Sequence, residues 1–171
     1  MKRALLPFAV LAALALVATA GIFFTRGDDT PELPPEIPKT GKLSSKAVAI
    51  EEKARTLQDV WRNNEIAFRD KKEFRALADL HRDFPALAAE ARAIQGDTKT
   101  ESDALPHLIA SLDASGRIAG VFVMYHVNES MATAESWAKA KEDAALANAE
   151  WKAWKDGTQT LSREAAPAKA P

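Results

Sequence analysis

The stretch LSSKAVAIEEKARTLQDVWRNNEIAF, residues 43–68, decides the fold class of this chain. Its apolar residues recur at alternating steps of four and three, which is the spacing of one face of a helix that packs against others. Ser44 and Ser45 can cap the start of such a helix, because their hydroxyls accept free backbone N–H groups. The pattern predicts a helix over about residues 44–68, with these seam positions: Leu43, Ala47, Ile50, Ala54, Leu57 and Trp61.

The same spacing continues through residues 77–94, where Pro85 is expected to break the helix into segments 70–83 and 84–95. After a polar loop the pattern changes. Residues 107–112 and 117–127 flank a four-residue turn and are rich in β-branched and aromatic side chains, which predicts a β-hairpin. A long helix is expected from about Thr133 to Asp156. The predicted fold class is therefore mostly α with a small β-hairpin (α+β).

The N-terminus carries an apolar run. Ala4 to Phe24 are 21 residues without a charge, and at 1.5 Å per residue they span about 31 Å, close to the thickness of a bilayer core. One interpretation is an uncleaved transmembrane anchor. The other is a signal peptide cleaved before Gly21. Lys2 and Arg3 keep the N-terminus in the cytoplasm in both cases, so the rest of the chain is exported.

Four segments follow from these patterns. Four prolines in eight residues, between positions 31 and 38, favour an extended spacer after the apolar run, and an Ala/Pro-rich tail closes the chain. The expected organisation is a membrane anchor or signal segment over 1–26, a Pro-rich linker over 27–42, an exported α+β domain over 43–157 and a disordered tail over 158–171.

Composition excludes several function classes. The 171 residues hold 23 basic and 24 acidic side chains, without the basic surplus of a nucleic-acid binder. Cysteine is absent, which excludes disulfides, thiolate nucleophiles and thiolate metal sites. His107 and His126 lie on the two predicted strands but about four residues out of register, and His81 lies on a separate helix, so the three cannot share one metal ion. Most carboxylates alternate with Lys and Arg, as on solvated helix faces. No catalytic, cofactor-binding or metal-binding residue is predicted, and we expect a protein that is not an enzyme.

Protein–protein contact is the expected mode of action. The second hairpin strand outruns its partner and leaves an uncharged apolar edge, and the last helix carries three indoles at seam spacing. The sequence predicts a single-pass protein of the inner membrane with a periplasmic domain, acting as an adaptor or accessory subunit through a partner protein or a second copy. The candidate interaction residues are Val121, Val123, Met124, Tyr125, Val127, Trp137, Trp151 and Trp154.

The layout resembles TonB-type energy transducers in one respect. A single N-terminal membrane helix, a Pro-rich spacer and the stretch SLDASGRIAGVFVMYHV (residues 111–127) followed by a helix are similar to the plan of that family. The resemblance implies an envelope transducer whose hairpin contacts a partner. A spanin-like spacer, in which the seams form one long coiled coil, is a second alternative, and a small periplasmic enzyme or ligand-binding domain is a third.

Overall fold

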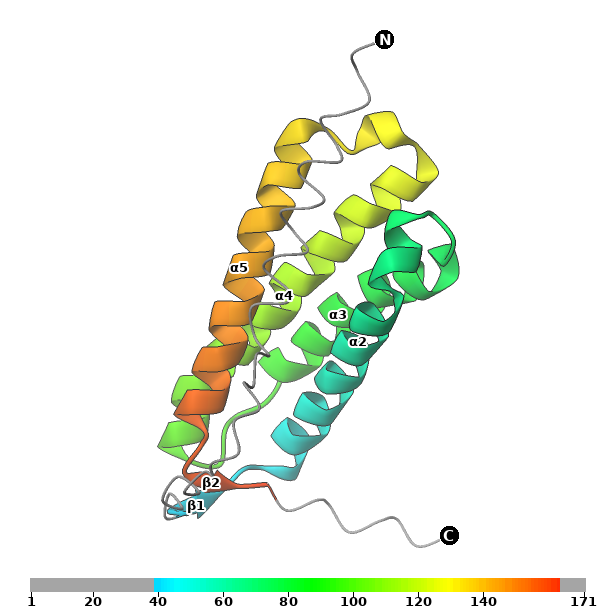
Figure 1. Cartoon of the computed structure of the whole chain (residues 1–171). Coiled ribbons are helices and arrows are strands. Elements are labelled where there is room, and N and C mark those ends of the chain that lie inside the picture. The colour runs from blue at the N-terminus through cyan, green and yellow to red at the C-terminus, as the bar shows by residue number, and fades with distance from the viewer. Residues whose placement is uncertain (1–38, 164–171) are drawn as a thin grey trace, which may run out of the picture.

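A computed structural model describes residues 39–163 of the chain, and these residues form a bundle of four helices closed at one end by a two-stranded parallel sheet. The predicted membrane segment and most of the Pro-rich linker lie outside the described residues. Figure 1 shows the helices running alternately up and down. Their bounds are α2 Ser45–Arg69, α3 Phe74–Arg92, α4 Lys99–Val127 and α5 Ala134–Gly157, with a 3-10 turn, η1, at Glu129–Met131.

The first and last helices form as the sequence predicts. In α2 the Ser44 hydroxyl accepts the backbone N–H of Ala47, and the Thr133 hydroxyl caps α5 by accepting the N–H of Ser136. Both predicted ranges agree with the structure within a residue or two. The mostly helical fold class is thus confirmed.

The predicted hairpin is wrong. The residues assigned to it belong to α4, which is one continuous helix through the predicted turn. Local β-propensity is a weak preference, and here the burial of a helical stripe outweighs it. The stripe steps by three and four, and α4 lies between α3 and α5. A central helix is apolar on several faces, which explains why both faces of the predicted hairpin were apolar. The stripe comprises Leu105, Leu108, Leu112, Ala119 and Phe122.

The predicted break at Pro85 is also wrong, because α3 continues through it. Gly116 of α4 supplies the space for the proline ring. A Cβ atom at Gly116 would lie 2.8 Å from the Pro85 Cγ, closer than carbon atoms approach. The proline is therefore accommodated by a glycine on the neighbouring helix, a relation that single-helix rules do not contain.

The strands join the two ends of the described chain. Strand β1 (Gly41–Lys42) pairs in parallel with β2 (Leu161–Ser162), so that the segment before α2 and the segment after α5 leave the same end of the bundle. We call this the strand end. The opposite end, made by the α2–α3 turn and the α4–α5 connection, is called the far end.

α4 is the central helix of the core. α3 and α5 pack along it, whereas α2 packs against α3 and more lightly against α4. Within residues 39–163, α4 is also the one helix long and apolar enough to suit a membrane span. Half of its most apolar window is buried against the bundle, as expected for a central helix of a folded domain.

Candidate functional site

The eight predicted interaction residues do not form one surface. Their choice rested largely on an open strand edge, and that edge does not exist because the segment is helical. Three of the eight are buried, namely Val121, Trp137 and Trp154, and Val127 is 63% exposed. The other four, Val123, Met124, Tyr125 and Trp151, are partly buried against the core.

Most of the aromatic side chains gather in the half of the bundle nearer the far end. Phe122 is at the centre of this aromatic cluster, with ring centroids 5.2 Å from Trp61 and 5.0 Å from Trp137, both edge-to-face. Tyr125 contacts Trp137 at 5.7 Å, and Trp61 contacts Phe68 at 5.4 Å. The side chains of this cluster connect α2, α4 and α5.

Beyond the aromatic cluster, the far end exposes apolar side chains to solvent. Ile66 is 76% exposed, Phe74 45%, Val127 63% and Met131 50%. They come from the last turn of α2, the start of α3, the end of α4 and η1, all of which meet at this end. We call these four residues the far-end patch. One of them, Val127, is among the candidate interaction residues named from the sequence.

Two ion pairs lie at the same end of the bundle as the far-end patch. Lys71 pairs with Glu129 at 2.8 Å and lies 4.5 Å from the ring centroid of Tyr125, while Lys72 pairs with Asp70 at 3.0 Å. Lys71 adopts a φ of 57°, a left-handed conformation that side chains other than glycine seldom take. The charges of these four residues are therefore balanced within the two pairs.

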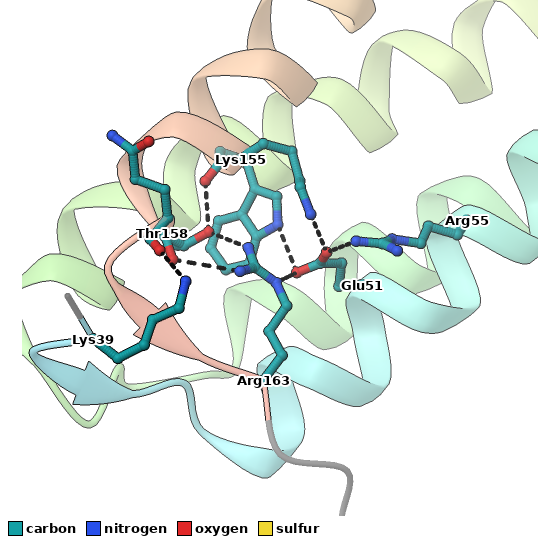
Figure 2. A network of polar contacts seen from close by, with 8 residues as sticks. Lys39, Glu51, Arg55, Lys155, Thr158 and Arg163 are labelled. Atoms are coloured by element: carbon teal, nitrogen blue, oxygen red, sulfur yellow. Dashed lines mark hydrogen bonds and ion pairs between the residues drawn. The ribbon is translucent and has the colours of Figure 1, made fainter. Parts of the chain in front are cut away.

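The strand end has the opposite chemistry. Glu51 of α2 is only 2% exposed, although a carboxylate is costly to bury without partners. Figure 2 shows the groups that surround it. Lys155 donates to it at 2.9 Å, Arg163 at 2.9 Å and the Trp154 indole at 3.2 Å, and Arg55 forms an ion pair from one turn along α2. We call these five residues the Glu51 cluster.

The pKa of Glu51 shows which influence prevails. Burial alone would raise the pKa of this carboxyl, but the hydrogen bonds and charges of Arg163 and Lys155 outweigh burial and lower it from 4.5 to about 2. Glu51 is therefore ionised at neutral pH. It joins α2 to α5 and to the segment after β2, and so connects the first and last parts of the described chain.

Two further buried carboxylates are also engaged within the fold. Glu101 is fully buried and accepts the backbone N–H groups of Ser44 and Asp97, together with the Ser44 hydroxyl. Asp143 of α5 accepts hydrogen bonds from two nitrogens of Arg117 at 2.7–3.1 Å, and these hydrogen bonds raise the pKa of Arg117. These groups hold elements together.

Each of the three histidines contacts a group within the fold, and His107 and His126 both lie on α4 and not on two strands as predicted. His107 pairs with Glu150 at 2.6 Å, the His81 Nδ1 lies 3.2 Å from the Gly116 carbonyl, and the His126 ring contacts the Phe68 carbonyl. Within residues 39–163 no group of three or more potential ligands is placed to hold a metal ion.

Sequence reasoning assigned Glu51 to a solvated face and so missed the Glu51 cluster. A weak signal was present, since positions 47, 51, 54, 58 and 61 step by four and three as regularly as the seam that was chosen. The cations that neutralise Glu51 lie 104 and 112 residues further along the chain, at Lys155 and Arg163. Spacing along one helix cannot show such partners.

The resemblance to TonB-type transducers loses its main support, because the hairpin that carried it is a helix. Comparison of the chain with protein-family models, with curated proteins and with solved structures finds no match.

Proposed function

We propose that this chain is a membrane-anchored, exported helical bundle that acts without catalysis, as an adaptor or accessory subunit of an envelope complex in the periplasm. The apolar run before the linker holds it in the inner membrane, and protein–protein contacts carry its function. The observation that supports this most directly is the far-end patch.

The far-end patch has the composition of a small protein contact. Four exposed apolar side chains come from four elements that end at this side of the bundle, and exposed apolar groups on one part of a surface mark interaction sites more often than scattered ones do. The ion pairs Lys71–Glu129 and Lys72–Asp70 add polar groups at the same end. An apolar centre with a polar rim fits a protein surface better than it fits a charged ligand.

The use of the buried carboxylates also supports a role other than catalysis. An acid or base in an enzyme is usually left available to substrate in a cleft. Here Glu51, Glu101 and Asp143 are each enclosed by partners from other elements of the fold. Among the described residues, these three buried carboxylates therefore stabilise the bundle.

Two measurements on the full chain in its native membrane test the proposal. Mass spectrometry of the membrane-bound protein should find the N-terminal segment intact. Because the chain has no cysteine, a single Met131→Cys substitution allows a photo-crosslinker to be placed on the far-end patch. It should yield one defined adduct, and a second substitution, Val127→Lys, should abolish that adduct.

The matched control carries the probe at Ala89→Cys, an exposed position of α3 outside the patch. Equal adducts from the two positions would refute a specific contact at the far end. A mature protein that begins at Gly21 and leaves the membrane would refute the anchor.

A further inference from the structure

The helices α2 and α5 leave a seam between them. Within the described residues α5 packs along α4, and the backbones of α2 and α5 do not approach each other closely. Side chains bridge the two helices, at the strand end through the Glu51 cluster and further along through the aromatic cluster. We call this strip the α2–α5 seam, and it is seen in Figure 1 with α4 behind it.

Two half-buried tryptophans lie on the α2–α5 seam. Trp151 is three and four residues before Trp154 and Lys155, so it shares their face of α5. The contact between Glu51 and Trp154 sets the heights of the antiparallel helices, and it places Trp151 level with Ala54. Trp61 is seven residues further along α2, so the two indoles are about 10 Å apart along the seam.

The foot of the seam has an excess of positive charge. Arg55, Lys155 and Arg163 surround the single carboxylate of Glu51, which leaves two positive charges more than negative ones. A segment that lay in the seam would be favoured if it carried acidic groups.

We propose that the chain's own Pro-rich segment, Asp28–Pro38, docks along the α2–α5 seam. This segment holds four acidic residues, four prolines and no basic residue. It joins the domain at the foot of the seam, where Lys39 donates to the Gln159 carbonyl at 2.7 Å just before β2. The charge and the point of attachment of the segment thus both match this strip of the surface.

The spacing matches as well. Proline-rich chains rise about 3.1 Å per residue with three residues per turn, so prolines three apart recur about every 9 Å on one side. Pro31 and Pro34 have this separation, and it is close to the spacing of the two indoles. Proline rings bind preferentially to aromatic faces of this kind. The 11 residues reach about 34 Å, nearly the length of α2.

Docking of the segment would change how the bundle stands at the membrane. A free linker lets the domain move up to about 40 Å from its anchor. A docked linker runs from the strand end towards the far end and holds the bundle close to the bilayer, with the far-end patch nearest to it. The docking itself does not depend on the proposed function, because it involves only the linker and the bundle.

Crosslinking within the full, cysteine-free chain tests this placement. Leu33→Cys combined with Asn148→Cys, an exposed position three residues before Trp151 on the α5 side of the seam, should react with a short bis-maleimide to give a crosslink within one chain. The control pair is Leu33→Cys with Ala89→Cys on α3. Since a docked segment has a high effective concentration at the seam, we expect the first pair to react about tenfold faster.

A variant that also carries Glu32→Lys and Glu36→Lys tests the contribution of charge. In it, the crosslinking rate of the Leu33→Cys/Asn148→Cys pair should fall to that of the control pair. Equal rates for the seam and control pairs in the parent chain would overturn the proposal, as would a product that links two different chains. The measurement in detergent micelles does not require a membrane anchor. A seam crosslink in a chain that proves to be cleaved at Gly21 would therefore refute the proposed function and leave the docking intact.

Discussion

The two ends of the bundle are stabilised by different chemistry. The strand end contains a buried carboxylate, three cations and a strand pair, drawn from segments more than 100 residues apart. The far end contains an aromatic cluster and, beyond it, exposed apolar side chains. Substitutions at the strand end should therefore affect folding first. The exposed residues of the far end contribute little to folding, which leaves them available for contact with another protein.

The largest expected effect is on the strand end. Glu51→Gln removes the only carboxylate from a group of three cations. Breaking a buried ion pair by removing one partner costs about 3–5 kcal/mol, and we expect chemical denaturation to show a loss of this size. Glu52→Gln, at the exposed neighbouring position, is the matched control and should change the unfolding free energy by less than about 0.5 kcal/mol. Equal effects would mean that the Glu51 cluster does not hold this end.

Acid should weaken the same end. The pKa of Glu51 is lowered to about 2 in the folded chain, so its contribution to stability is present above pH 4.5 and is lost as the pH falls from 4.5 towards 2. A difference of this size corresponds to about 3 kcal/mol. The comparison with Glu51→Gln isolates the contribution of Glu51 from that of the other acidic residues. The stability gap between parent and variant should narrow over this pH interval, and a constant gap would contradict the assignment.

The aromatic cluster should show a smaller effect. Phe122 and Phe84 are equally buried, but Phe122 contacts two other rings, whereas Phe84 contacts none within residues 39–163. Each edge-to-face pair contributes about 0.5–1.5 kcal/mol beyond burial. Phe122→Leu should therefore lower the unfolding free energy by about 1–3 kcal/mol more than Phe84→Leu. Equal losses would show that the cluster acts through burial alone.

The difference between the ends also explains which features could be predicted from the sequence. Helices α2 and α5 follow from apolar spacing and capping residues within one segment. The helical state of α4 depends on being surrounded by α3 and α5, so its β-branched residues pointed to strands. Continuation of α3 through Pro85 depends on Gly116, 31 residues away, and the Glu51 cluster depends on Lys155 and Arg163. Features confined to one helix were predictable, whereas features created by packing between helices were not.

The smallest effect on folding, and the most informative about function, is expected at the far-end patch. Val127→Lys changes a side chain that is already 63% exposed, so the unfolding free energy should change by less than about 0.5 kcal/mol. Val123→Lys, one turn earlier on α4, places a charge among residues packed against the core and should cost more. Denaturation of both variants, together with crosslinking from Met131→Cys in the membrane, separates the two roles. If Val127→Lys keeps full stability and still gives the parent adduct, the far-end patch is not the contact surface.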